Sequence, residues 1–226
     1  AYEIPKRDWS SDVCSSDLVG SNSFAVAGRL TANGGALVAN DMHLLIRVPN
    51  TWYRAALEWP DPANAQEPHR MIGVTLPGVP AVVVGSNTHV AWGFTNTYAD
   101  WSDVVLLDVE GNTYRTPDGP RTFDRYDEVI KVAGGADEHM TVHWTIWGPR
   151  IAPDYRGRFR AYRWVAHSAE QLATSIAPFE SATTIEAAMD EANGLGTPGQ
   201  NLVVADRSGR IGWSVYGSIP RRRGRS

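Results

Sequence analysis

Gly20-Ser21-Asn22-Ser23-Phe24-Ala25-Val26-Ala27-Gly28 is the stretch that decides the fold, because a small polar segment passes here directly into an apolar run. Phe24 to Ala27 predicts a β-strand, and Ala36 to Ala39 predicts a second one. Asn33-Gly34-Gly35 lies between the two runs and has the residue types that a hairpin turn requires. The sequence therefore predicts a β-sheet that opens at residue 21.

Short apolar runs bounded by turn residues continue along the chain and predict further strands. These runs are Ile72 to Leu76, Ala81 to Val84, Val90 to Phe94, Val104 to Val109, Glu128 to Val132, Met140 to Ile146, Phe159 to Val165, Leu202 to Ala205 and Ile211 to Tyr216. Ser168 and Thr183 are each followed three residues later by Gln or Glu, as in a helix capping box. Helices are accordingly predicted over Gln171 to Ala177 and Ile185 to Ala192.

The bulk composition excludes several classes of protein. A hydrophobic content of 42% over 226 residues is enough to fill a core, and a net charge of -4 gives no basic field for nucleic acid. The basic run Arg221 to Arg225 is read as a solvated tail. No stretch approaches the roughly 18 apolar residues of a membrane span. The single cysteine, Cys14, excludes an internal disulfide and a cysteine-based zinc cluster.

The first residues differ in character from the rest. Arg7 to Leu18 is polar and aperiodic, and it resembles the translation of a sequencing adapter. Residues 1–18 are therefore set aside as a non-native or spacer-like segment.

Ser21 and His43 are candidate catalytic residues, although neither is informative by itself. A serine before a strand is usually a turn residue, and an isolated histidine such as His43 is usually structural. The chain lacks Gly-x-Ser-x-Gly, His-Glu-x-x-His and a glycine-rich phosphate loop. The elbow-serine hydrolases, the zinc proteases and the nucleotide-binding proteins are therefore disfavoured.

Five blocks of sequence, taken in order, carry a more specific signal. Together they resemble the start of the β-chain in the penicillin acylase family of N-terminal-nucleophile hydrolases. The blocks are Ser21 to Gly28, Gly35 to His43, Gly73 to Pro80, Gly85 to Asn96 and Gln200 to Gly212. Their order and approximate spacing agree over nearly all of residues 20–222.

The resemblance implies an α+β fold with four αββα layers, of which this chain would hold part. Two antiparallel sheets would pack face to face between helical layers. Cleavage of one precursor between Gly20 and Ser21 would make two chains, so residues 19–226 would be the N-terminal part of the catalytic β-chain. The partner would be an α-chain from the same precursor, and the location would be periplasmic or secreted.

The resemblance also implies how the reaction runs. Cleavage would free the α-amino group of Ser21, whose pKa of about 7.7 to 8.0 suits a base for its own hydroxyl. The side-chain amide of Asn201 and the backbone N–H of Asn96 would stabilise the oxyanion. His43 would orient the Ser21 amine or hydroxyl, and Arg222 lies where the family often has an arginine.

Asp100 and Asp103 match a calcium-ligand segment of the family. Carboxylate and carbonyl oxygens suit this cation, which takes 6 to 8 oxygen ligands. A structural calcium ion is therefore expected there, and no organic cofactor is expected.

The expected substrate is a linear N-acyl amide, with penicillin or cephalosporin side chains, acyl-homoserine lactones and similar compounds left open. Phe24, Trp52 and Tyr53 are expected either to line an apolar acyl pocket or to be plain core. Two alternatives remain: a catalytically inert fragment, or a non-catalytic β-rich binding module suggested by the nine tryptophans.

Overall fold

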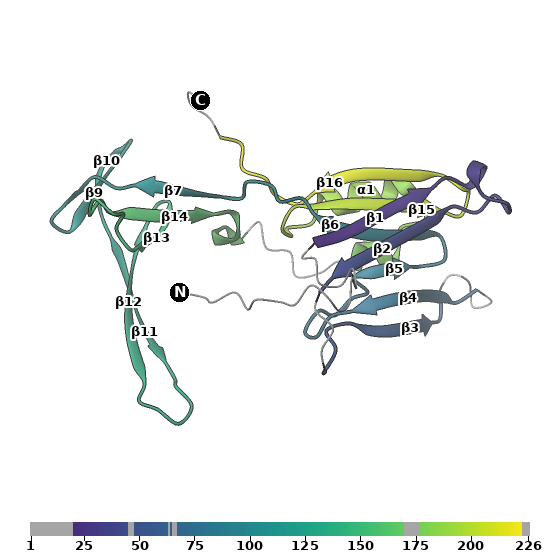
Figure 1. The fold of residues 1–226 in the computed structure, drawn as a ribbon, viewed down its shortest axis with the longest axis horizontal. Helices are drawn as coiled ribbons and strands as arrows, with labels where there is room; N and C mark the ends of the chain where they lie inside the picture. Colours follow the sequence, from purple (N-terminus) through teal and green to yellow (C-terminus); the bar gives the residue numbers. More distant parts are fainter. Residues whose placement is uncertain (1–19, 45–47, 63, 65–66, 170–176, 223–226) are drawn as a thin grey trace, which may run out of the picture. The chain divides into compact units, whose positions relative to one another are not determined.

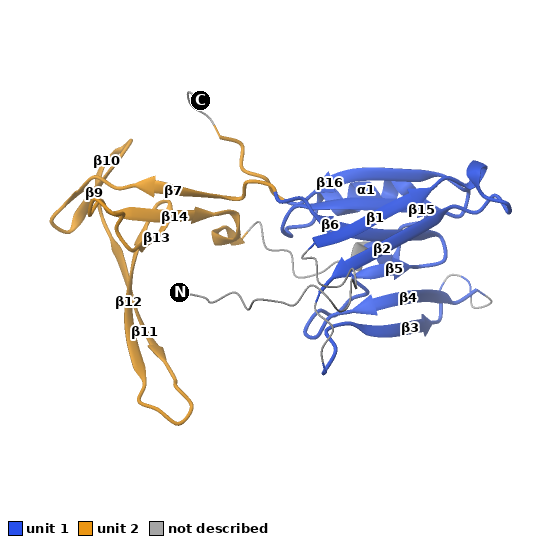
Figure 2. Ribbon diagram, viewed as in Figure 1, with its two compact units in different colours: residues 1–98, 172–217 blue, residues 99–171, 218–226 orange. Residues whose placement is uncertain are grey.

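The computed structural model describes residues 20–44, 48–62, 64, 67–169 and 177–222. The chain divides into two compact units, coloured separately in Figure 2. Unit 1 comprises residues 1–98 and 172–217, and unit 2 comprises residues 99–171 and 218–226.

Unit 1 begins with the predicted hairpin. Strands β1 (Gly20–Val26) and β2 (Leu37–His43) pair in antiparallel fashion, with Ser21 opposite Met42 and Gly20 opposite His43. The two strand predictions are confirmed, and the first strand begins earlier than Phe24, at Gly20. The connection contains the 3-10 helix η2 (Gly28–Leu30) and a turn in which Gly34 has a φ of 77°.

A six-stranded antiparallel sheet forms the middle of unit 1, in the order β16-β15-β6-β5-β4-β3. Its strands are β3 (Tyr53–Trp59), β4 (His69–Thr75), β5 (Val84–Ser86), β6 (Val90–Asn96), β15 (Gln200–Asp206) and β16 (Ile211–Tyr216). The strand predicted over Ala81 to Val84 is wrong, because Ala81, Val82 and Val83 lie outside any strand. Val82 lies in the core without belonging to a strand, and it is only 2% exposed.

The β1–β2 hairpin covers one face of this sheet and α1 (Ile185–Asn193) covers the other (Figure 1). The core lies on the α1 side, where Trp92 stacks on Phe179 with ring centroids 5.2 Å apart. Leu202 and Val204 of β15 are fully buried beneath the helix. The described residues thus supply three of the expected layers, and the four-layer arrangement stays a prediction.

The helix predictions have mixed outcomes. The helix over Ile185 to Ala192 is confirmed, but its N-cap is Thr184 rather than Thr183, since Thr184 Oγ1 accepts a hydrogen bond from Ala187 N at 3.1 Å. The helix predicted over Gln171 to Ala177 falls outside the described residues except for its last member. That residue, Ala177, begins the 3-10 helix η5 (Ala177–Glu180).

Unit 2 is built from two antiparallel sheets and the 3-10 helix η3 (Val165–His167). The five-stranded sheet has the order β11-β12-β13-β14-β7, and the three-stranded sheet has the order β10-β9-β8. Their bounds are β7 (Ser102–Leu106), β8 (Val109–Glu110), β9 (Thr113–Thr116), β10 (Gly119–Thr122), β11 (Asp124–Ile130), β12 (Glu138–Thr145), β13 (Gly148–Ile151) and β14 (Arg160–Trp164). A small core joins Leu107, Tyr114, Phe123 and Ala161.

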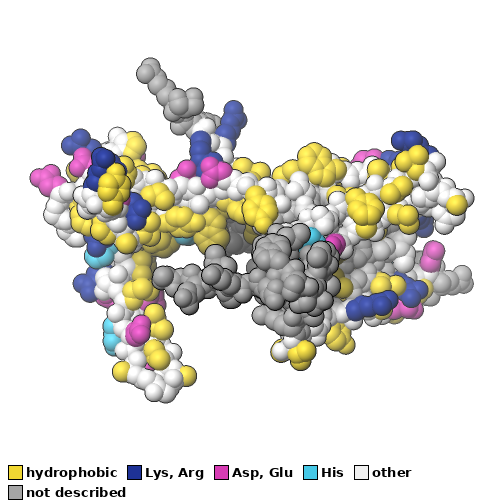
Figure 3. Space-filling view, in the orientation of Figure 1, with side chains coloured by type: hydrophobic (Ala, Val, Ile, Leu, Met, Phe, Trp, Pro, Cys, Tyr) yellow, Lys and Arg dark blue, Asp and Glu magenta, His cyan; other side chains and the backbone are white. Residues whose placement is uncertain are grey.

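Unit 2 also keeps large apolar side chains at its surface. Val104 and Leu106 on β7 are 52% and 51% exposed, and Trp164 on β14 is 43% exposed. Figure 3 shows hydrophobic side chains gathered over these strands.

Candidate active site

Ser21 lies within β1, directly after the peptide bond that the sequence predicts to break. Its Oγ donates a hydrogen bond of 2.7 Å to the carbonyl oxygen of Gly20. The hydroxyl is therefore already held against the neighbouring carbonyl group.

The Asn40 carboxamide fixes the hairpin on the six-stranded sheet. Its Nδ2 donates to the carbonyl oxygen of Phe94 in β6 at 2.9 Å and to that of Asn22 in β1 at 2.8 Å. Its Oδ1 accepts from the N–H of Phe94 at 3.2 Å. One side chain of β2 thus ties β1 and β6 together, and sequence reasoning missed this role.

Two glycines let the hairpin approach the sheet closely. A Cβ on Gly93 of β6 would lie 3.0 Å from both Ser23 Oγ and Asn40 Cβ. At the far end of β1, the N–H of Gly28 donates to the carbonyl oxygen of Gly209 at 2.8 Å. These two anchors set the direction of β1 across the sheet.

The direction of β1 carries Ser21 toward a particular part of the sheet. Gly209 follows the end of β15 that pairs with the start of β6, and Gly93 lies farther along β6. Gly28 thus lies near the start of β6 and Ser23 lies near Gly93. Two residues farther in the same direction, Ser21 should lie near Thr95. Alternation along a strand puts the side chains of Ser21 and Ser23 on the same face, toward the sheet.

Asn201 and Asn96, the predicted oxyanion donors, lie together at this end of the sheet. Asn201 is opposite Thr95 in the β15–β6 register, and its Nδ2 donates to Thr95 Oγ1 at 3.1 Å. The same Nδ2 lies 3.5 Å from the carbonyl oxygen of Asn96. An amide nitrogen carries two protons, so the weakly held one is available to a ligand. Thr95, which orients this amide, is a second residue that the sequence reasoning missed.

His43 lies on the other face of the hairpin. It is opposite Gly20 in the register, and a Cβ on Gly20 would lie 3.5 Å from His43 Nδ1. Its Nε2 lies 2.8 Å from Asp41 Oδ2 and 3.2 Å from Asn22 Nδ2. The structure shows no hydrogen bond between the side chains of His43 and Ser21. His43 lies beside Gly20 instead, and its predicted contact with the Ser21 amine stays a prediction.

Arg222 belongs to unit 2, with the two predicted calcium ligands. Its Nε lies 3.0 and 3.1 Å from the two carboxylate oxygens of Asp103, and its Nη2 lies 3.1 Å from Asp100 Oδ1. It also donates to the carbonyl oxygens of Asp100 and Ser102 at 3.3 Å. The hydrogen bond to Asp103, with the nearby charges of both carboxylates, raises the pKa of Arg222. Arg222 is thus held by carboxylate and carbonyl oxygens of unit 2, and its predicted role in the active site stays a prediction.

Asp100 and Asp103 do not by themselves make a calcium site. The described part of the chain contains no group of three or more His, Cys, Asp or Glu side chains that could hold a metal ion. Calcium requires 6 to 8 oxygens, and both carboxylates already contact the Arg222 guanidinium. Further ligands would have to be backbone carbonyl, amide or hydroxyl oxygens, or groups outside the described residues.

The aromatic residues predicted for an acyl pocket are mostly exposed. Phe24 is 58% exposed and Tyr53 is 70% exposed, so neither is a core residue of this chain. The indole of Trp52 differs, because its Nε1 is buried and has no hydrogen-bond partner.

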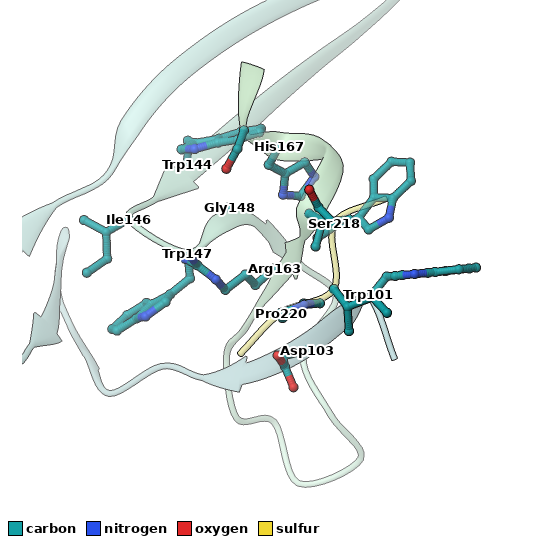
Figure 4. Close-up of a pocket in the computed structure, with 14 residues that line it drawn as sticks. Trp101, Asp103, Trp144, Ile146, Trp147, Gly148, Arg163, His167, Ser218 and Pro220 are labelled. Atoms are coloured by element: carbon teal, nitrogen blue, oxygen red, sulfur yellow. The ribbon is translucent and has the colours of Figure 1, made fainter. Parts of the chain in front are cut away.

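A separate cavity of about 460 Å³ lies within unit 2 (Figure 4). Tryptophans line much of it: Trp101, Trp144, Trp147 and Trp164. His167 also lines it, and burial, together with the charge of Arg163, lowers the pKa of that imidazole. The cavity shares only Asp103 with the predicted site residues.

The fold and the site define a class of protein. In it a β-hairpin packs on a larger sheet, the hairpin carries a serine whose hydroxyl contacts the preceding carbonyl group, and the sheet carries an asparagine amide. Comparison with known proteins agrees. The penicillin amidase family model matches residues 3–226, and the chain belongs to that family.

Individual relatives are acylases. The chain is 30% identical over 224 residues to the acyl-homoserine lactone acylase QuiP of Pseudomonas aeruginosa, covering 91% of this chain and 25% of that protein. It is 31% identical over 208 residues to the penicillin acylase 2 proenzyme of Pseudomonas sp. strain SE83, covering 90% and 26%. The structure of a thermostable penicillin G acylase from Alcaligenes faecalis matches with a TM-score of 0.61 at 25% identity, covering 73% of this chain and 29% of that one.

The chain spans about a quarter of the length of these curated relatives. No helix in the part of the chain that the structure describes is long and apolar enough to cross a membrane.

Proposed function

We propose that this chain carries the nucleophile of an amidohydrolase that cleaves N-acyl amides after self-cleavage between Gly20 and Ser21. The position of Ser21 carries the proposal. Its hydroxyl donates to the Gly20 carbonyl at 2.7 Å, and β1 leads it toward the end of the sheet where Asn201 lies.

Self-cleavage begins when Ser21 Oγ adds to the Gly20 carbonyl carbon. The amide C–N bond then breaks, leaving an ester on Oγ and a free amine on Ser21. Water hydrolyses the ester to give the Gly20 carboxylate and the Ser21 hydroxyl.

The mature site uses the same atoms on a second carbonyl group. The Ser21 amine takes the hydroxyl proton as Oγ attacks the substrate amide, and the leaving amine receives that proton as the C–N bond breaks. Water then releases the acid from the acyl-enzyme. The Asn201 amide and the Asn96 N–H are proposed to stabilise the negative oxygen of each tetrahedral intermediate.

The substrate class is an N-acyl compound with an apolar acyl group. The names of the relatives support this, since they are acylases of homoserine lactones and penicillins. The exposed rings of Phe24 and Tyr53 are suited to such a group. The rest of the precursor, an α-chain included, is the proposed partner, in the periplasm or outside the cell.

The test is intact mass and N-terminal sequencing of freshly expressed protein. We expect a new chain that begins Ser21-Asn22-Ser23 in the wild type and in Ser23→Ala, and none in Ser21→Ala. Ser23 is the matched control, because it is a serine on the same face of β1. An uncut wild type would contradict self-cleavage of this chain and favour an inert fragment or a binding module. The cut protein would next be assayed for acid release from N-acyl amides.

A further inference from the structure

We propose that Asp41 is a positioning residue for His43, which it holds with Nε2–H toward the carboxylate and Nδ1 toward Gly20. No catalytic role was expected for Asp41 from the sequence. The use of this pair in cleavage rests on the proposed function, whereas the contact itself does not.

The register of the hairpin creates the pair. Asp41 and His43 are two residues apart on β2, so their side chains leave the same face. Across the hairpin, Asn22 is opposite Asp41 and Gly20 is opposite His43. The imidazole side chain of His43 is 10% exposed, whereas the side chain of Asp41 is 61% exposed. A largely shielded histidine thus contacts a solvated carboxylate at 2.8 Å.

The chemistry of the carboxylate decides which ring nitrogen carries the proton. An ionised aspartate only accepts hydrogen bonds, so the nitrogen that contacts Asp41 must be the donor. In the neutral ring the other nitrogen, Nδ1, is then the acceptor. The Asn22 carboxamide, which also contacts Nε2, can satisfy the same N–H by presenting its oxygen.

This orientation gives His43 a specific task at the bond beside it. Ser21 Oγ lies on one face of the hairpin, against the Gly20 carbonyl, and His43 lies on the other face, with Nδ1 beside Gly20. After Oγ has formed the ester, water can add to the Gly20 carbonyl carbon while its proton passes to Nδ1. The C–Oγ bond then breaks, and Ser21 Oγ recovers a proton from the imidazolium. Asp41 stabilises that cation and keeps Nδ1 in place.

The experiment observes the ring proton directly, by one-bond ¹H–¹⁵N correlation of the histidine side chains in ¹⁵N-labelled chain. The background is Ser21→Ala, so that cleavage cannot change the sample, and His43→Gln assigns the resonance. We expect a protected Nε2–H of His43 that disappears in Asp41→Ala, because the proton then exchanges with water. Asp61→Ala is the matched control, because Asp61 lies 3.7 Å from the Nε2 of another histidine, His69.

A proton on Nδ1, or an Nε2–H signal that persists in Asp41→Ala, overturns the proposal. If Asp41→Ala disturbs the fold, Asp41→Asn decides, since it keeps the shape but lacks the charge. Faster exchange of Nε2–H than in the parent is expected there, and an unchanged rate overturns the proposal.

A second readout is the rate of cleavage in the presence of Ser21. Asp41→Ala is expected to slow the appearance of the Ser21 terminus by about ten- to a hundredfold, within the range of general acid–base catalysis. Asp41→Asn should restore part of the rate, because its side-chain oxygen can still accept the Nε2–H of His43. A wild type that is never cut would contradict the proposed function alone. The ring-proton measurement does not require cleavage, so it would still test whether Asp41 holds the His43 ring.

Discussion

Asn40 in β2 bonds both backbone polar groups of Phe94 in β6, 54 residues farther along the chain. Its Nδ2 also reaches the carbonyl oxygen of Asn22 in β1. This carboxamide therefore bonds the backbones of both β1 and β6, which do not pair with each other in a ladder. The placement of Ser21 over the sheet therefore depends on a residue that is not itself a candidate for chemistry.

Replacement of Asn40 should loosen the hairpin. Asn40→Ala removes three hydrogen bonds, each of which contributes about 1 kcal/mol, so we expect a loss of about 2 to 3 kcal/mol in the free energy of unfolding. Asn40→Asp puts a carboxylate oxygen against the two carbonyl oxygens to which Nδ2 donates, so it should destabilise at least as much as Asn40→Ala. Urea denaturation followed by tryptophan fluorescence measures both. Equal stability of Asn40→Ala and the wild type would show that the hairpin is held by other contacts.

Gly93 should resist any side chain. Its added Cβ would lie 3.0 Å from Ser23 Oγ and Asn40 Cβ, which is tighter than normal packing, so Gly93→Ala must push the hairpin away from β6. We expect a cost of about 1 to 3 kcal/mol and slower appearance of the Ser21 terminus. Gly194→Ala is the control, because its nearest neighbour would be 3.5 Å away. A tolerated Gly93→Ala would contradict the close approach.

Thr95 should matter through Asn201. Thr95→Val keeps the shape and removes the oxygen 3.1 Å from Asn201 Nδ2, so the amide loses its orientation. If the mature enzyme hydrolyses amides as proposed, Asn201→Ala should lower kcat by about 10²- to 10³-fold. Thr95→Val should lower it by about tenfold, the value of one net hydrogen bond. Single-turnover acylation measures both, and a fully active Thr95→Val would remove Thr95 from the site.

Local patterns predicted those strands whose apolar residues lie next to one another. Val90 to Phe94 is such a run, and it forms most of β6 in the centre of the sheet. Tyr53–Trp59 was missed, because β3 is an edge strand in which Arg54 and Glu58 break the apolar pattern. The apolar run around Val82 predicted a strand that does not form, because Val82 is a core residue of a connecting segment.

The candidate site was predictable where the resemblance reached individual residues, such as Ser21, Asn96 and Asn201. It was not predictable where a contact joins distant segments. Asn201 and Thr95 are 106 residues apart, and no local pattern connects them. The sequence also did not show which side chains share a face of the hairpin. Only the pairing register shows that His43 is opposite Gly20 and on the other face from the Ser21 hydroxyl.

His167 should make the stability of unit 2 depend on pH. Burial, then the charge of Arg163, lowers the pKa of His167 from its usual value of 6.5. Below about pH 6.5 the unfolded chain therefore binds a proton that the folded chain does not. The free energy of unfolding then decreases as the pH is lowered, until the pKa of His167 in the folded chain is reached. The melting temperature should drop as the pH falls below about 6.5.

Two variants separate the causes of that slope. His167→Gln should flatten it, and Arg163→Gln should reduce it only in part, because burial is the larger cause. Differential scanning calorimetry at several pH values measures the effect. An identical slope in wild type and His167→Gln would assign the pH dependence to other groups.

Arg222 should act as the cation that Asp100 and Asp103 require. With the guanidinium present, added calcium has little to neutralise, and we expect it to change the melting temperature of the wild type only slightly. Arg222→Gln leaves two carboxylates near each other without a counter-charge, so calcium should raise its melting temperature more than that of the wild type. Asp103→Asn in the same background should cancel the response. Equal responses in wild type and Arg222→Gln would contradict a competition between calcium and the arginine for the two carboxylates.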